Sequence, residues 1–179
     1  MANTMHLIQT YTVPSSTNSF SFNTIPATYT DLVIYYQAQI TNSGTGWYDF
    51  LMTLNGSTSG YSGNTNYADG TGGTTPTKLS ITESSSAIVQ RCNTNTSPNT
   101  QYSFSVGKIY IPNYRSSLTK TLLNDHVTEQ QNTTGNGAAG LFANATRWNS
   151  TAAINTITVT GLSGNNITAG STFSIYGIS

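Results

Sequence analysis

Short runs of alternating polar and apolar residues, separated by turn residues, constrain the fold of this chain more than any other feature. The segments between the runs are rich in Gly, Asn, Ser and Pro, and no run has the spacing of an amphipathic helix. The runs lie at residues 7–13, 19–25, 31–40, 47–55, 101–111, 118–129, 140–148, 154–162 and 171–178. Such spacing is typical of sandwiches, so we predict an all-β fold: an antiparallel β-sandwich, jelly-roll-like, with about eight to ten strands.

Two runs predict where the core lies. In the last run, STFSIYGI, alternation places Phe173 and Ile175 on one face and polar neighbours on the other. Because unpaired chain ends fray, this run is expected to be an integral strand of a sheet. In DLVIYYQAQI, Leu32 shares a face with Ile34 and Tyr36, whereas Val33 and Tyr35 lie on the opposite one. Apolar bulk on both faces predicts a central strand that is covered on both sides.

Composition limits the class of protein. Hydrophobic residues make up 36% of the 179 residues and lie in discrete runs, which favours a folded chain over a disordered one. A chain of this length can bury a core without disulfides, so one domain over residues 1–179 is expected. The stretch at residues 55–78 has almost no aliphatic residues and predicts a long surface loop with room for one short hairpin.

Charge and hydropathy argue against two classes of partner. Six Lys plus Arg balance six Asp plus Glu, and only 7% of residues are charged, so the basic footprint of a nucleic-acid-binding protein is missing. The first residues, MANTMHLIQTYTV, lack a basic segment followed by an apolar stretch. No run approaches the roughly 18 apolar residues of a membrane span. We therefore expect no cleaved secretion signal, no membrane and no nucleic acid.

Residues that could carry chemistry are few. Asp125 and His126 are neighbours on a predicted strand and should therefore point to opposite faces. Glu129 shares the face of Asp125 but lies about 13 Å away, too wide for the paired acids of a glycosidase. Cys92 has no second cysteine or nearby histidine, and the stretch NTTGNGAAG lacks the lysine of a phosphate-binding loop. The sequence thus predicts no catalytic site, no metal site, no cofactor and no enzyme.

Four residues are candidates for a recognition surface. Tyr61 and Tyr67 stand among small polar residues near Asp69, a composition typical of surfaces that bind sugars or protein. Tyr114 follows a predicted strand and is expected just past a sheet edge. The alternative, which we favour for Tyr61 and Tyr67, is that their rings fold back as a small core within the loop.

Three segments of the chain carry a resemblance to a known group of proteins. The segments IPATYTDLVIYYQAQI, KIYIPNYRSSLTKTLL and INTITVTGLSGNNITAGSTFSIYGI resemble small β-rich virion proteins of tailed bacteriophages, cyanophage-like ones among them. The shared elements are an early Pro-x-x-Tyr-x-Asp-Leu, a central Ile-Pro-Asn-Tyr and an ending close to Leu-Tyr-Gly-Ile. This chain departs from the pattern at Ile175, which replaces Leu, at the additional Ser179, and in the stretch at residues 55–78.

The resemblance implies a non-enzymatic component of the virion surface. It points to capsid decoration or cement, or to a head fibre, with a receptor- or glycan-binding module of a tail fibre as the alternative. The implied partners are other virion proteins, either the major capsid protein or fibre and tail components, and a host glycan under the alternative. Sheet edges with few lysines invite pairing between copies, so a homo-oligomer is also expected, with a trimer favoured.

Overall fold

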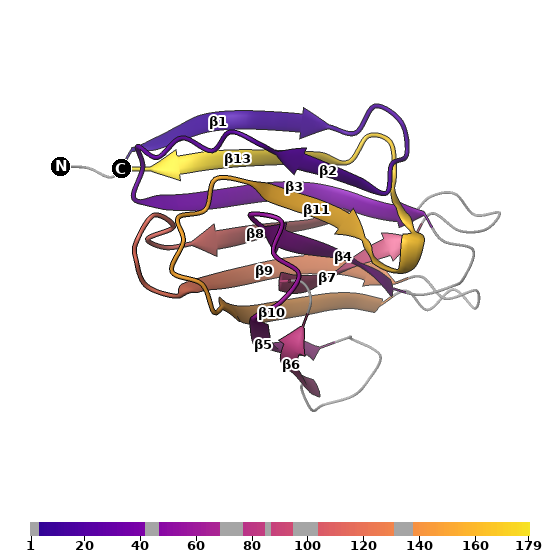
Figure 1. Ribbon diagram of the computed structural model, residues 1–179. Coiled ribbons are helices and arrows are strands. Elements are labelled where there is room, and N and C mark those ends of the chain that lie inside the picture. The colour runs from indigo at the N-terminus through magenta and orange to yellow at the C-terminus, as the bar shows by residue number, and fades with distance from the viewer. Residues whose placement is uncertain (1–3, 42–46, 69–76, 85–86, 95–103, 131–137) are drawn as a thin grey trace.

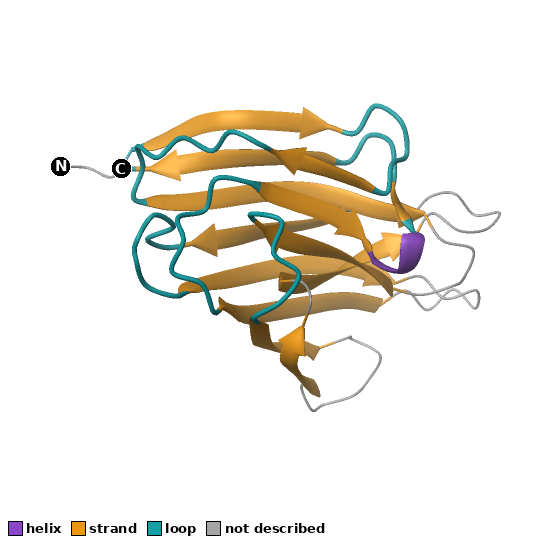
Figure 2. Ribbon diagram, viewed as in Figure 1, coloured by secondary structure: helices purple, strands orange, loops and turns teal. Residues whose placement is uncertain are grey.

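The computed structural model describes residues 4–41, 47–68, 77–84, 87–94, 104–130 and 138–179. These residues form thirteen strands and one 3-10 turn (Figure 2). The all-β prediction is confirmed, but the expected number of about eight to ten strands was too low. The elements are β1 (Met5–Thr12), β2 (Ser19–Phe22), β3 (Asp31–Thr41), β4 (Trp47–Leu54), β5 (Tyr61–Ala68), β6 (Thr77–Ser84), β7 (Ala87–Thr94), β8 (Ser105–Ile111), β9 (Lys120–Gln130), β10 (Ala138–Trp148), β11 (Ile157–Gly161), η1 (Leu162–Gly164), β12 (Asn166–Ile167) and β13 (Thr172–Ile178).

The strands form a large and a small sheet that face each other as a sandwich (Figure 1). The large sheet is antiparallel throughout, in the order β1-β13-β3-β8-β9-β10-β5-β6. The small sheet has the order β2-β11-β4-β7. It lies over the part of the large sheet that contains β13, β3 and β8, so the core forms there.

Strand β3 belongs to both sheets. Its first residues pair with β13 and β8 in the large sheet. Near its end, Gln39 and Ile40 pair in parallel with β7, and Ile40 and Thr41 pair with β12. The strand therefore links the two layers covalently at one edge of the sandwich.

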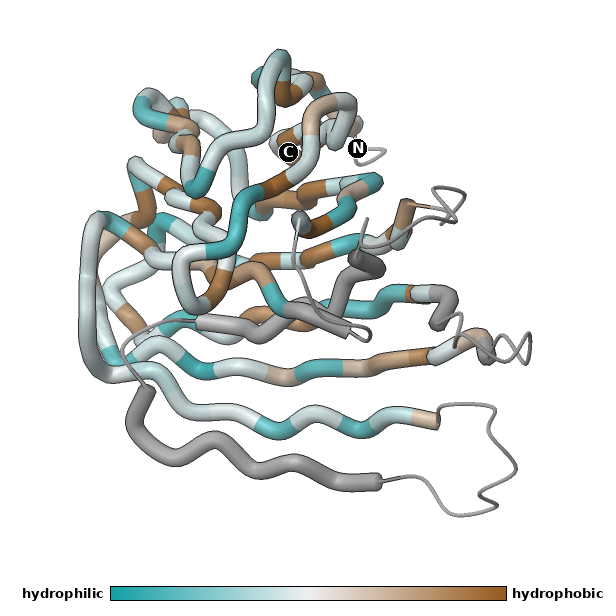
Figure 3. The backbone as a smooth tube through the Cα atoms, turned by 90° about the vertical axis from the view of Figure 1, so that its right-hand side faces the viewer, coloured by the Kyte–Doolittle hydropathy of each residue, from teal (hydrophilic) through white to brown (hydrophobic). Residues whose placement is uncertain are grey.

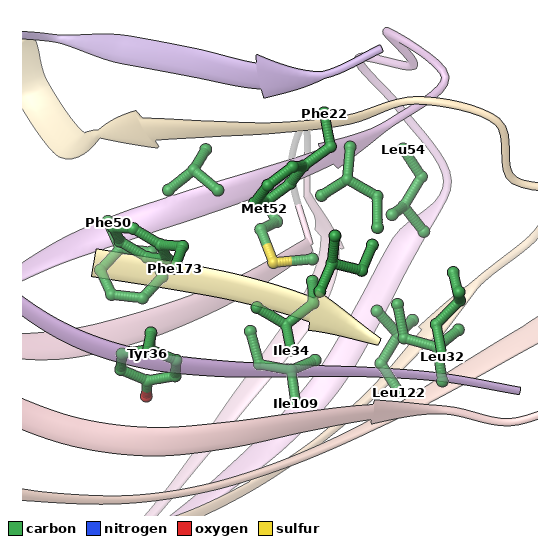
Figure 4. Packing of buried hydrophobic residues seen from close by; sticks show 14 of the residues in the cluster. Phe22, Leu32, Ile34, Tyr36, Phe50, Met52, Leu54, Ile109, Leu122 and Phe173 are labelled. Atoms are coloured by element: carbon green, nitrogen blue, oxygen red, sulfur yellow. The ribbon is translucent and has the colours of Figure 1, made fainter. Parts of the chain in front are cut away.

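The hydrophobic core is built from the two inner faces of the sandwich (Figure 4). The large sheet supplies Leu32, Ile34, Tyr36, Ile109, Ile111, Leu122, Phe173 and Ile175, and the small sheet supplies Phe20, Phe22, Phe50, Met52, Leu54, Ile157 and Val159. Phe173 and Ile175 are both fully buried, which confirms the core face predicted for the last strand. On β13, alternation in sequence up to Tyr176 becomes alternation in burial, and on β4 the residues Phe50, Met52 and Leu54 are buried at alternate positions.

The prediction for β3 is only partly correct. The strand is central, and Leu32, Ile34 and Tyr36 are buried as expected. On its other face Val33 is buried, but Tyr35 is 43% exposed. Apolar residues on both faces therefore do not mean that both faces are covered within one copy of the chain.

The stretch at residues 55–78 was predicted as a surface loop, and this is wrong for most of its described part. Residues 61–68 form β5, which pairs with β10 on one side and β6 on the other. The expected short hairpin corresponds to the β5–β6 pair, but β5 also extends the large sheet. A strand can form without aliphatic side chains because the neighbouring strand supplies its main-chain hydrogen bonds. Residues 69–76 lie outside the described part of the chain.

Beyond the apolar core, the inner face of the large sheet is polar. Its buried polar residues there are Thr65, Ser105, Asn124, His126, Thr128, Asn144 and Thr146. Asn124 Nδ2 lies 3.0 Å from His126 Nδ1, the His126 ring stacks on Phe142 at 4.6 Å, and the Ser105 and Thr128 hydroxyls are 2.7 Å apart. In Figure 3 the strands nearest the termini carry most of the apolar segments, whereas those at the far edge are mainly white and teal.

Candidate functional site

The outer face of the large sheet, which is turned away from the small sheet, is the candidate functional site. Strand register arranges its side chains in three rows that cross β3, β8, β9 and β10. Row one is Val33, Tyr110, Leu123 and Ala145; row two is Tyr35, Lys108, Asp125 and Ala143; row three is Gln37, Val106, Val127 and Leu141. Rows one and three are mostly apolar, and they flank a middle row with charges at its centre.

Strand β9 shows how unusual this face is. Leu123 and Val127 point outward and are 44% and 45% exposed. The polar residues Asn124, His126 and Thr128 point inward and are buried, together with one apolar residue, Leu122. A half-covered sheet normally has the reverse pattern, with apolar residues inside and polar residues outside. Two of the three apolar residues of β9 therefore lie on the outer face, where the described part of the chain leaves them nearly half exposed.

Three of the exposed apolar side chains are contiguous: Val106, Val127 and Leu141 are register neighbours in row three. Tyr35 and Leu123 lie in rows two and one, and all five side chains are more than two-fifths exposed. Between β3, β8 and β9 the face is hollowed into an open depression of about 570 Å³. Single exposed apolar residues are common on soluble proteins, but a contiguous patch usually marks an interaction site.

One ion pair occupies the middle of the face. Lys108 Nζ lies 3.8 Å from Asp125 Oδ2, and the side chains are 43% and 49% exposed. A pair this open to solvent adds little to stability, about 0–1 kcal/mol. The pair does, however, place a positive and a negative side chain next to each other at the centre of a mostly apolar surface.

Two of the predicted recognition residues do not lie on the surface. Tyr61 is 1% exposed, its ring stacks on Trp148 at 6.0 Å, and its hydroxyl accepts a 2.9 Å hydrogen bond from the Leu54 amide. Tyr114 is fully buried and donates to the Pro26 carbonyl. The prediction is therefore wrong for both: each phenol ring joins the main core, with its hydroxyl satisfied by the backbone.

The other two candidates for the recognition surface are Tyr67 and Asp69. Tyr67 is partly buried on the inner face, where its ring stacks on Phe142 at 5.4 Å. Asp69 lies outside the described residues. The alternative that we favoured, a small core within the loop, is also wrong for Tyr61, because Tyr61 packs in the main core.

The residues weighed for catalysis lie apart in the structure. Asp125 points outward and His126 is buried on the inner face, which confirms that their side chains lie on opposite faces of the strand. The side chains of Cys92 and Glu129 lie outside the description. Within the described ranges, no group of three or more His, Cys, Asp or Glu residues is placed to hold a metal ion. No helix in those ranges is long and apolar enough to cross a membrane.

The buried tyrosines predict how stability depends on alkaline pH. Burial raises the pKa of Tyr61 and of Tyr114 above the ordinary value of 10.0. The unfolded chain therefore loses these protons first, so their contribution is intact below pH 10 and is lost as pH rises further. We expect the free energy of unfolding to fall above pH 10 by up to about 1.4 kcal/mol per pH unit for each tyrosine. Urea unfolding between pH 9 and 11 measures this slope.

Tyr61→Phe isolates one of these contributions. The variant should be less stable at neutral pH, because the Leu54 amide loses its acceptor, but its stability should fall less steeply above pH 10. Burial lowers the pKa of Lys120 from its ordinary 10.5, which makes stability rise with pH up to that value. Since Lys120 is present in both proteins, its opposite effect cancels in the comparison. If the free energies of unfolding of the wild type and of Tyr61→Phe fell with the same slope above pH 10, the prediction would be contradicted.

Comparison of the chain with protein-family models, with curated proteins and with solved structures finds no match. The functional argument therefore depends on the chain's own residues and on the outer face that they form.

Proposed function

We propose that this chain is a non-enzymatic structural protein of the tailed-phage virion surface, acting as capsid decoration or cement or as part of a head fibre. The observation that carries the proposal is the reversed polarity of β9, which leaves Leu123 and Val127 outside and Asn124 and His126 inside. An apolar sheet face of this kind is suited to packing against protein. The sequence resemblance supports a virion as the assembly in which that packing occurs.

The chemistry of the face favours a protein partner over a substrate. Its apolar residues include the branched side chains Val106, Val127 and Leu141, which pack well against other side chains but offer no flat surface for a sugar ring. Asp125 is the acid in the depression, and its neighbour His126 has its side chain on the other side of the sheet. This arrangement supports assembly, not hydrolysis.

A receptor- or glycan-binding module of a tail fibre is the second candidate. The observation in its favour is Tyr35, an exposed aromatic ring beside Lys108 and Asp125 in the depression. An aromatic ring next to polar side chains can stack on a sugar and hydrogen-bond to its hydroxyls. Binding of host surface glycans that is lost in Tyr35→Ala, with particle association retained, would favour this candidate.

The proposal is tested on particles of the phage that encodes the chain. Quantitative mass spectrometry of purified particles should find the chain in many copies. Particles made without it should bind the purified wild-type protein, and Leu141→Lys should bind much more weakly because it places a charge within the apolar face.

A matched leucine provides the control for that test. Leu118 is 71% exposed but lies in the segment between β8 and β9, outside the three rows. Leu118→Lys makes the same chemical change and should bind particles like the wild type. Absence of the chain from purified particles would overturn the proposed function.

A further inference from the structure

We propose that the outer face of the large sheet is covered by the same face of a second copy of this chain. The two copies would be related by a twofold axis that lies in the interface and runs parallel to the strands, between β8 and β9. The inference rests on the proposed function, because it names the protein that covers the face. A contact of this symmetry requires a surface that is complementary to itself. Four features of the face are compatible with this requirement: the number of strands on each side of the axis, the positions of the charges, the sizes of the facing side chains, and the area of the face.

The proposed axis divides the large sheet into equal halves. Strands β1, β13, β3 and β8 lie on one side, and β9, β10, β5 and β6 lie on the other. Rotation about an axis parallel to the strands reverses strand order but keeps each row over itself. It therefore places β8 over β9 of the second copy and β3 over its β10, so the two sheets overlap across their whole width.

The central charges become complementary under this rotation. Lys108 and Asp125 are register partners in row two, on either side of the axis. Lys108 of each copy then faces Asp125 of the other, so four charges of alternating sign meet and no like charges oppose each other. Opposite charges in these positions fix the register of the two faces.

The shapes of the rows are also complementary. In row two, the exposed Tyr35 ring of β3 faces the small side chain of Ala143 on β10 of the second copy. In row one, Tyr110 faces Leu123 of the second copy. In row three, Val106 meets Val127 of the second copy, and the aliphatic part of Gln37 meets Leu141.

The area of the face is sufficient for a stable dimer. From β1 to β6, the outermost strands that this rotation superimposes, there are seven strand spacings of about 4.8 Å, which give a width of about 34 Å. The three rows and the reach of their side chains add a height of about 20 Å, so each copy offers about 680 Å². Two copies together bury about 1,400 Å², within the range for specific interfaces.

The inference is tested by sedimentation equilibrium of the purified full chain. The wild type is expected to be a dimer. Leu141→Lys should raise the dimer dissociation constant by about a hundredfold or more, because two leucines are lost from the interface and two charges are buried in it. Leu118→Lys should leave the constant unchanged, and circular dichroism should show that both variants are folded.

A charge exchange tests the arrangement of the two copies. Lys108→Asp alone places two carboxylates opposite each other at two points of the interface and should weaken the dimer roughly tenfold or more. The double variant Lys108→Asp, Asp125→Lys restores opposite charges across the axis and should recover most of the affinity. Thermal melts of the single and double variants, at a concentration where both are monomers, measure how much the ion pair within one copy contributes to stability. That contribution is then separated from the recovery of dimer affinity.

The outcomes separate this inference from the proposed function. A monomer, a trimer, or a dimer indifferent to Leu141→Lys would overturn the second copy as the cover. If the chain is a monomer that is present in particles, and Leu141→Lys abolishes its binding to particles, then another virion protein covers the face. The proposed function would still stand in that case. A dimer that is sensitive to Leu141→Lys but absent from particles would support the interface and overturn the virion role.

Discussion

Deletion of residues 171–179 is expected to leave the chain unable to fold. These residues contain β13, which pairs with β1 on one side and with β3 on the other. Its removal therefore breaks two antiparallel ladders and leaves β1 without its partner strand. It also removes Phe173 and Ile175 from the core, which alone costs about 5–10 kcal/mol by large-to-small substitution. That loss is comparable to the whole stability of a typical domain, about 5–15 kcal/mol.

The measurement is solubility and far-UV circular dichroism of the truncated chain, followed by thermal unfolding of any soluble fraction. The control keeps β13 but replaces Thr172 and Ser174 by alanine. Both side chains lie on the outer side of the strand, where they contact Thr12 and Thr10 of β1. The control should fold. A soluble truncation that melts cooperatively at the wild-type temperature would show that β13 is not needed by the fold.

Alternation predicted the strands that contact the apolar core. On β4, Phe50, Met52 and Leu54 are fully buried, and on β13 Phe173 and Ile175 are fully buried. In these strands one face meets the opposite sheet and the other does not, so hydrophobicity reports burial directly. The fold class and the place of the last strand could therefore be predicted from sequence.

Strands β5, β6, β7 and β12 lie wholly or mainly outside the predicted runs. β5 has the sequence YSGNTNYA: its two tyrosines stack on Trp148 and Phe142, and the small residues between them are held by main-chain pairs with β10 and β6. β12 is the two-residue strand Asn166–Ile167, held against the end of β3. Main-chain pairing depends on which segments meet in space, and side-chain pattern does not report it when the residues are small and polar.

The outer face was missed because alternation separates two faces without saying which one meets the core. In KTLLNDHVTEQ the more apolar set includes Leu123 and Val127, which the simplest interpretation would bury. The structure turns that set outward, and the alternate set faces inward: Leu122 joins the core, and His126 is paired with Gly107 and Phe142. The signal available in the sequence was Leu123 and Val127 together with Leu141, whose contiguity appears only once β9 and β10 are paired.

The second of the two largest effects is expected from Phe173→Ala, which keeps both ladders of β13 and removes only its central side chain. The Phe173 ring lies 4.9 Å from Phe20, 5.6 Å from Phe50 and 5.9 Å from Tyr36, measured between ring centroids. Phe20 and Phe50 belong to the small sheet and Tyr36 to the large one, so this ring joins the two layers (Figure 4). Its loss leaves a cavity that rings on two rigid sheets cannot close.

We therefore expect Phe173→Ala to lower the free energy of unfolding by about 3–5 kcal/mol in urea titrations at fixed protein concentration. Phe173→Leu keeps part of the volume and should cost clearly less, while Ser174→Ala on the exposed side of the same strand should change stability by about 0.5 kcal/mol or less. This order separates packing between the sheets from strand pairing. If Phe173→Ala cost no more than Ser174→Ala, the sandwich would be held by its ladders alone, and the aromatic contact between the two layers would be incidental.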